Sequence, residues 1–450
     1  MSPDPMPEML CQLTASEARR QIADGLITSE QLVQACLDRI AETDTGIGAW
    51  VHLDTEGALS QARGLDDLRR KGRTLGPLHG VPVGLKDIFD VKDMPTECGS
   101  PARKGTIAEI DCPVTAKLRE AGAVIMGKTV TTEFAFLNPA HTSNPHNHAH
   151  TPGGSSSGSA AAVAAGHVPL AIGSQTNGST VRPASFCGIF GFKPTRGMIS
   201  RTGVLQTSVT LDQVGVFGRS LEDVSLLADA LSGFDPRDPA SLPRPLPSPT
   251  AGLARQPLVE PDLVWLDMPF HDRLTDDARS GLEDILAALG DRVERIEAPK
   301  SVAALVDHQM TVHEYEIARH LADDIDRHWD MISDTLKPVV ERGRAYSDQQ
   351  YAEALSMVAG AEDFFEEFFH DYDGIIAPSA AGEAPLKADG TGDPVFCTIW
   401  TTAGLPAVNL PLLSGSAGLP IGVQLIGSGE QDDRLMTTAQ WLVSALAANE

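Results

Sequence analysis

One lysine and two serines have residue types and local sequences suited to nucleophilic catalysis. Lys86 directly follows the short apolar run 81–85, Ser155 lies in the Gly/Ser run 153–159, and Ser179 closes a polar turn. A serine hydroxyl is a poor nucleophile until a base removes its proton. A lysine can be that base when its amine is neutral, which desolvation favours. Because an apolar strand would carry Lys86 into the interior, these residues indicate attack by a lysine-activated serine; a surface lysine opening a loop is the alternative.

The turn that carries Ser179 could supply a second requirement of acyl chemistry, an oxyanion hole. It reads Thr176-Asn177-Gly178-Ser179. A tight glycine-containing turn lets several backbone N–H groups converge on one point, and each such donor stabilises an oxyanion by about 3 kcal/mol. Taken alone, the motif is also consistent with an ordinary Gly-Ser turn.

Three motifs in this order resemble the amidase signature family of serine hydrolases, which uses a Ser–cis-Ser–Lys triad. They are Gly84–Asp87, Pro152–Gly166 and Gly173–Gly188. The two serines are 24 positions apart, as in that family. The resemblance runs from about residue 13 to about residue 447 and is faint between about 236 and 369.

The resemblance assigns a role to each residue of the triad. It makes Ser179 the nucleophile, Lys86 the base and Ser155 the serine that relays the proton between them. It also implies that the peptide bond between Gly154 and Ser155 is cis. The oxyanion hole would consist of the backbone amides of Thr176, Asn177, Gly178 and Ser179. The family needs no cofactor and no metal.

Three further residues are expected to support the triad, and one position departs from the family pattern. Ser156 would be a supporting hydrogen-bond donor. Gln175 stands where many members have Asp and would form a structural pair with Arg182 behind the turn. Asn177 replaces a glycine that usually precedes the nucleophile. Asn tolerates positive φ better than other non-glycine residues, and its side chain would point toward the acyl pocket.

Four apolar residues are candidates for the substrate pocket, although core packing is an equally good interpretation of each. They are Phe134, Phe136, Ile399 and Trp400. Four histidines precede the Gly/Ser run, at positions 141, 146, 148 and 150. They could suggest a metal site, but the prolines at 145 and 152 mark a loop, so no metal is expected.

The elements that must position these residues alternate between strands and helices. Apolar runs predict strands at 81–85, 123–127, 263–266, 374–378, 407–411 and 421–426, and a helix is expected at 114–121. Capping-box spacing after Thr14 and Thr28 predicts two N-terminal helices. The pattern predicts a single large α/β domain over 1–450, with a mixed, mostly parallel central sheet covered by helices on both faces. The catalytic core would be about 65–235 and 371–450, and about 236–370 would be a variable, mainly helical segment on the substrate side.

Composition narrows the classes of partner. The 450 residues include 61 acidic and 35 basic side chains, a net charge of −26, which disfavours nucleic acid and anionic membranes. The six cysteines form no CxxC pair. The N-terminus lacks a secretory signal pattern, and no apolar run reaches the roughly 20 residues of a membrane span, so a cytoplasmic protein is expected. A homodimer is left open.

These observations predict a serine amidohydrolase that cleaves C(O)–N bonds of small neutral amides. A carbamate (urethane) or urea-type hydrolase with the same triad, with urethanase or esterase activity, is the first alternative. The others are the A chain of an amidotransferase that works on charged tRNA and an inactive binding protein. The acidity argues against the amidotransferase, and the complete triad argues against the binding protein.

Overall fold

A computed structural model describes residues 7–448, which form one mixed sheet of eleven strands. The strands are β1 (Trp50–Leu53), β2 (Pro82–Lys86), β3 (Val124–Thr129), β4 (Leu170–Gln175), β5 (Phe190–Lys193), β6 (Gln213–Gly218), β7 (Leu263–Asp267), β8 (Val293–Glu297), β9 (Gly374–Pro378), β10 (Ala407–Ser414) and β11 (Pro420–Ile426). All six predicted strands are therefore present.

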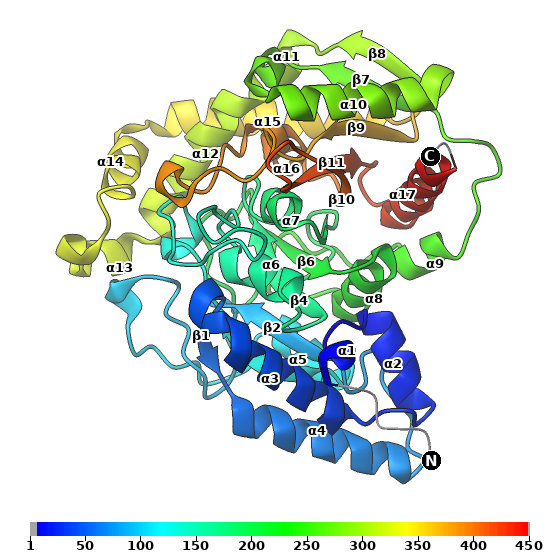
Figure 1. Ribbon diagram of the computed structural model, residues 1–450. Helices are drawn as coiled ribbons and strands as arrows, with labels where there is room; N and C mark the ends of the chain where they lie inside the picture. The colour runs from blue at the N-terminus through cyan, green and yellow to red at the C-terminus, as the bar shows by residue number, and fades with distance from the viewer. Residues whose placement is uncertain (1–6, 449–450) are drawn as a thin grey trace.

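Helices surround this sheet along the whole described chain (Figure 1). The α-helices are α1 (Pro7–Leu10), α2 (Ala15–Ala23), α3 (Ser29–Ile47), α4 (Thr55–Arg70), α5 (Pro113–Glu120), α6 (Ser157–Ala164), α7 (Val181–Cys187), α8 (Leu221–Leu231), α9 (Pro249–Leu253), α10 (Asp276–Leu289), α11 (Lys300–Ala303), α12 (Leu305–His320), α13 (Ala322–Arg327), α14 (Lys337–Ala345), α15 (Asp348–Phe368), α16 (Val395–Thr402) and α17 (Asp432–Ala447). Short 3₁₀ turns are η1 (Pro101–Arg103), η2 (Glu133–Ala135), η3 (Pro269–Arg273), η4 (Gly290–Arg292), η5 (Trp329–Met331) and η6 (Lys387–Asp389).

The strand directions differ between the flanks and the centre of the sheet. The order is β1-β3-β2-β4-β6-β5-β10-β11-β9-β7-β8. Among residues 7–448, four neighbouring pairs run parallel and six antiparallel. The parallel pairs lie in β3-β2-β4 and β9-β7-β8, because helical crossovers such as α5 and α10 connect parallel strands. The prediction of a mixed sheet in one α/β domain is confirmed, but the prediction that it is mostly parallel is wrong.

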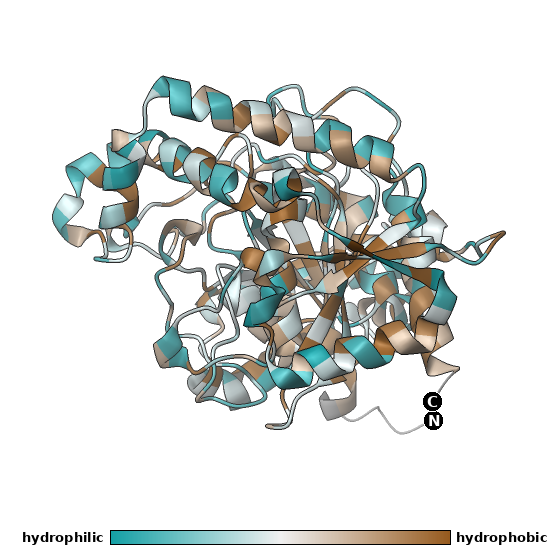
Figure 2. Ribbon diagram, turned by 90° about the horizontal axis from the view of Figure 1, so that it is seen from above, coloured by the Kyte–Doolittle hydropathy of each residue, from teal (hydrophilic) through white to brown (hydrophobic). Residues whose placement is uncertain are grey.

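Helices cover both faces because alternate strand residues enter different apolar clusters. On β3, Ile125 packs into one cluster while Val124 and Met126 pack into another, and on β4 Ile172 and Ala171 divide in the same way. One cluster includes α5, α8 and α10, and the other includes α2, α3 and α6. Figure 2 shows hydrophobic colour along the inner strands and hydrophilic colour along the outward-facing helices.

The N-terminal helices begin where the sequence predicts. Thr14 and Thr28 each accept a hydrogen bond from the third helical N–H, and Glu17 and Gln31 each accept one from the cap backbone N–H. These reciprocal bonds satisfy N–H groups that have no partner inside a helix. The capping boxes therefore fix the starts of α2 and α3.

The segment 236–370 contains α9–α15 together with β7 and β8, so it contributes both helices and two edge-proximal strands. Within residues 7–448, no helix combines the length and the apolarity that crossing a membrane requires. All six cysteines are buried, and the described chain contains no disulfide between them.

Candidate active site

Lys86 lies at the carboxyl end of β2, and its side chain is fully buried. β2 runs parallel to β4, so the ends of both strands meet at one edge of the sheet. Nζ of Lys86 lies 2.7 Å from Oγ of Ser155 and 2.8 Å from Oγ of Ser174. The structure thus joins Lys86 to Ser155 as expected and adds Ser174, which the sequence motifs did not single out although it directly precedes Gln175.

Burial gives Lys86 the pKa of a usable base. The loss of hydration lowers the pKa of its ammonium group from 10.5 to about 7. The nearby negative charge of Asp212 acts in the opposite direction. A large fraction of Lys86 is therefore neutral at neutral pH, and the neutral amine can accept a proton.

The segment around Ser155 is held from several sides. The Gly154–Ser155 peptide bond is cis. The backbone N–H of Thr132 donates to the carbonyl of Ser155 at 3.2 Å. The hydroxyl of Ser156 lies 3.3 Å from both the backbone nitrogen and the backbone oxygen of Ser174. Ser156 therefore anchors the end of β4 that carries the second partner of Lys86.

Arg182 connects two loops at the site. Its guanidinium is fully buried and donates to the carbonyls of Gly154 and Gly392, each at 2.8 Å, and to the carbonyl of Thr391. Burial lowers the pKa of Arg182 to about 10, so the side chain remains charged at neutral pH. Arg182 thus holds the peptide that precedes Ser155 against the loop 391–392.

Gln175 fixes the other side of the turn. Its Oε1 accepts hydrogen bonds from the N–H groups of Thr180 and Val181 at 2.8 and 2.9 Å, and its Nε2 donates to Thr401 at 2.9 Å. No hydrogen bond joins Gln175 to Arg182 within residues 7–448. The predicted Gln175–Arg182 pair is therefore wrong, because each side chain is fully occupied with its own partners.

The turn 176–179 leaves donors available. Within the described chain, the backbone N–H groups of Asn177, Gly178 and Ser179 donate to no protein acceptor. Neither Asn177 nor Gly178 has a positive φ, so the expected conformational demand at these positions is absent. A Cβ at Gly178 would lie 3.3 Å from the Cβ atoms of Pro394 and Cys397. Glycine is needed there because α16 packs against the turn.

Asn177 is fixed by its side chain. Its Oδ1 accepts a hydrogen bond from Thr398 at 2.6 Å, and its Nδ2 lies 3.4 Å from Oε1 of Gln309. Asn177 lines a cavity together with Thr176 and Ser179, in accordance with the expectation that it faces the pocket.

Ser179 is mostly buried and borders this cavity of about 280 Å³. Among the hydrogen bonds of residues 7–448, none involves its hydroxyl. The structure therefore places Ser179 at the pocket but does not join it to Ser155 by a hydrogen bond. In unliganded enzymes such bonds are often long and tighten when substrate binds.

Of the four predicted pocket residues, one lines the cavity. Phe136 does so, whereas Phe134, Ile399 and Trp400 are at most 3% exposed and belong to apolar clusters. Phe134 packs into the sheet core, and the other two pack under α15. Core packing was therefore the correct interpretation of these three residues.

The far wall of the cavity comes from α12, which the sequence analysis did not connect to the site. Val306, Gln309, Met310 and His313 line it, and their spacing places them on one face of a helix. This spacing was readable in the sequence. The partner of that face was not, because α12 lies in the segment where the family resemblance is faint.

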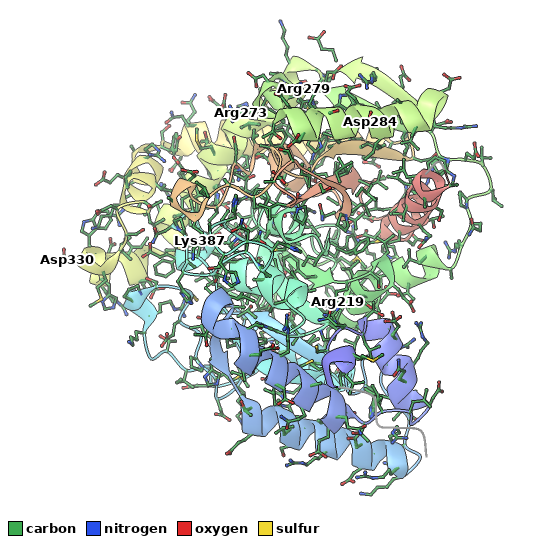
Figure 3. All side chains as sticks on the ribbon, viewed as in Figure 1. Arg219, Arg273, Arg279, Asp284, Asp330 and Lys387 are labelled. Atoms are coloured by element: carbon green, nitrogen blue, oxygen red, sulfur yellow. The ribbon has the colours of Figure 1, made fainter. Side chains whose placement is uncertain are left out.

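The cavity also has charged side chains at its edge, contrary to the expectation of a purely apolar pocket. Arg273, labelled in Figure 3, pairs with Asp393 at 2.8 Å. Arg342 pairs with the buried Glu314. Each arginine is thus neutralised by its own carboxylate.

The histidine cluster before the Gly/Ser run is structural. One ring nitrogen of His146 lies 2.9 Å from the carbonyl of Cys187, and one of His150 lies 2.6 Å from that of Ala384. No group of side chains within residues 7–448 has the arrangement of a metal site.

Comparisons with known proteins agree with this geometry. The Amidase family profile matches residues 31–436, and the chain therefore belongs to the amidase signature family. One relative, the A chain of glutamyl-tRNA(Gln) amidotransferase from Natranaerobius thermophilus, is 33% identical, over 96% of this chain and 95% of its own. Two solved structures are also similar. The peptide amidase of Stenotrophomonas maltophilia has a TM-score of 0.84 and 29% identity, over 98% of each chain. The other, described as a vestigial protein complex that reveals the origins of an s-triazine catabolic enzyme, has a TM-score of 0.91 and 28% identity, over 96% of this chain and 98% of its own.

Proposed function

We propose that this protein is an amidase that hydrolyses small neutral amides through an acyl-enzyme on Ser179. The observation that carries the proposal is the fully buried Lys86, whose Nζ lies within hydrogen-bond distance of Ser155 at the edge of the cavity that Ser179 borders. The family fixes the class of reaction, cleavage of a carbon–nitrogen bond.

The proposed reaction begins with transfer of the Ser179 proton to Ser155, as Ser155 passes its own proton to the neutral amine of Lys86. Oγ of Ser179 forms a bond to the substrate carbonyl carbon, and the resulting oxyanion accepts hydrogen bonds from the turn 176–179. When the C–N bond breaks, the same relay returns a proton to the leaving nitrogen. Water then attacks the acyl ester, Lys86 and Ser155 take up its proton, and the carboxylic acid leaves.

The cavity supports the choice of neutral substrates. Phe136, Val306, Met310 and Val339 supply apolar surface. Arg273 and Arg342 are paired with carboxylates, and Arg182 is engaged by three carbonyls. No unpaired basic group in the described lining is left to bind a carboxylate substrate, so an uncharged amide fits best.

The test compares Ser179→Ala and Lys86→Met with the wild type on p-nitroanilides. Both variants should lose at least about 1000-fold in kcat, because triad members act as a unit. A fluorophosphonate should label Ser179 in the wild type. Ser159→Ala is the matched control, since that hydroxyl from the same Ser-rich run bonds only to Thr129 and the carbonyl of Ile172. Activity of the Ser179 variant within tenfold of wild type, or labelling elsewhere, would overturn the proposal.

Carbamates and ureas form a second arm of the same assay. Their carbonyl presents the same oxygen to the turn, but it is less electrophilic, so we expect slower turnover than with the matched amide. Faster turnover of the carbamate would make the protein a urethanase that uses the same triad.

A second candidate function is transfer of an amide nitrogen to a glutamyl-tRNA. It is favoured by the name of the bacterial relative. The net charge of −26 opposes it, because a protein that binds tRNA usually presents a basic surface. Formation of glutaminyl-tRNA by this chain, alone or with partner proteins, would establish it, and hydrolysis of small amides without any such transfer would support the amidase.

A further inference from the structure

His313 is a buried polar side chain at the cavity that the proposed reaction does not use. It lies on α12, lines the cavity with Ser179 and Asn177, and is 7% exposed. Its Nε2 is buried, and neither ring nitrogen hydrogen-bonds to any described residue. Buried polar groups almost always have a partner, so the absence of a protein partner for this ring calls for an explanation.

The surroundings keep the ring neutral. Burial lowers the pKa of His313 to about 4, and the charge of Glu316 acts weakly in the opposite direction. Glu316 itself is occupied by Ser208, Thr210 and Tyr351. A neutral imidazole offers one donor and one acceptor, so it is matched to an uncharged group that can do both.

Neighbouring residues fix the ring beside other neutral polar groups. Phe136 packs edge-on against His313, with ring centroids 5.3 Å apart. Gln309, one helical turn earlier on α12, lies 3.4 Å from both the carbonyl of Thr176 and the amide of Asn177. The wall opposite the Ser179 turn is thus a strip of uncharged hydrogen-bonding groups within an otherwise apolar lining.

We propose that His313 is a specificity-determining residue that hydrogen-bonds a second, uncharged amide group of the substrate. The preferred substrates are then amides that carry a carboxamide on the part lying against α12. Substrates with an alkyl group at that place leave the imidazole unpaired, and a site with an unpaired buried polar group discriminates against the substrate that fails to satisfy it. This inference rests on the proposed function for the identity of the scissile bond.

The experiment measures binding and turnover with matched compounds. One series of p-nitroanilides ends its acyl chain in a carboxamide, three to five carbons from the scissile carbonyl. The second series ends in an isopropyl group of similar shape, and the third in a carboxylate. A further set places the same three groups on the amine side. Calorimetry on the Ser179→Ala variant gives binding without turnover, and wild-type kinetics give kcat/KM.

The carboxamide should be preferred over the isopropyl and carboxylate compounds by about tenfold or more for at least one chain length, as expected for one hydrogen bond to an otherwise unpaired group. His313→Phe should remove that preference and leave the isopropyl compound within about threefold. His313→Gln, which keeps a donor and an acceptor, should retain part of it. His308→Phe, on the same helix but outside the cavity lining, should change nothing.

Two results would overturn the inference. One is the absence of a carboxamide preference in the wild-type series. The other is an equal loss for both compounds in His313→Phe, which would show a purely structural role. If His313→Phe does not fold, the wild-type series and the Gln variant decide. A binding preference in Ser179→Ala together with no hydrolysis by the wild type would refute the proposed function and leave this inference standing.

Discussion

Lys86 and Lys193 are both fully buried, and burial lowers the pKa of each to about 7. Lys193 is surrounded by the side-chain oxygen of Gln213 and the carbonyls of Pro194 and Leu405. Lys86 faces two serine hydroxyls, one of them in the Gly/Ser run. The perturbed pKa is therefore shared, and the hydroxyl partners distinguish the proposed base.

The pH dependence of kcat/KM should follow the ionisation of Lys86. The amine must be neutral to accept a proton, and its pKa is lowered to about 7. The rate should therefore rise with pH through an apparent pKa near 7 and level off in the alkaline range. A pH–rate profile of a neutral anilide measures this, and an optimum below pH 6 would contradict the lysine base.

Replacing Asp212 should move that profile. The negative charge of Asp212 raises the pKa of Lys86, so Asp212→Asn should shift the profile to lower pH. The rate on the plateau should fall by about tenfold, because the carboxylate also anchors Thr176 at 2.5 Å. Asp432→Asn is the control, since that buried carboxylate acts on Lys193 instead. An equal shift in both variants would show that the effect is not specific to the pair.

At the scale of elements, the turn 176–179 is held by helices that come from distant parts of the sequence. Gln175 links it to α7 and, through Thr401, to α16. Gly178 packs against α16, and Gln309 of α12 contacts the turn at Thr176. The turn therefore depends on three helices for its shape.

Gln175→Met should loosen this arrangement. The substitution keeps the volume but leaves the N–H groups of Thr180 and Val181 without an acceptor, at a cost of about 1–3 kcal/mol each at most. We expect a loss of about 2–4 kcal/mol in the free energy of unfolding, measured by urea denaturation, with a larger loss in kcat than in KM. Unchanged stability would mean that water replaces the side chain.

At the scale of the whole molecule, one buried ion pair connects the core to the segment that follows it. Arg201 and Asp238 are both nearly inaccessible and lie 2.7 Å apart. Arg201 also donates to the carbonyls of Val209 and Asp212. The pair thus ties the segment 236–241 to the loop that supports Asp212 and, through it, Thr176.

Asp238→Ala should destabilise the protein by about 3–5 kcal/mol, because it leaves a buried guanidinium without its counter-charge. Thermal unfolding measures the loss. Arg237→Ala is the matched control, since its ion pair with Asp235 has a mostly exposed arginine and such pairs contribute about 1 kcal/mol or less. Similar losses in the two variants would contradict the importance of burial.

The sequence by itself determined the parts of the protein that depend on short-range chemistry. The triad motifs, the cis bond at Ser155, the capping boxes of α2 and α3 and all six predicted strands follow from local residue patterns, and the structure contains each of these features. Local patterns succeed here because hydrogen-bonding groups a few residues apart, or apolar periodicity, settle the outcome.

Only the tertiary structure decided how distant segments meet. The antiparallel centre of the sheet depends on the order of strand pairing, which apolar runs do not encode. Phe134, Ile399 and Trp400 look like Phe136 in the sequence, but strand and helix packing sends three of them into the core. His313 reaches the cavity because α12 packs against the turn from more than a hundred residues away. Burial and pairing across such separations are set by the packing of the whole chain, which no local pattern contains.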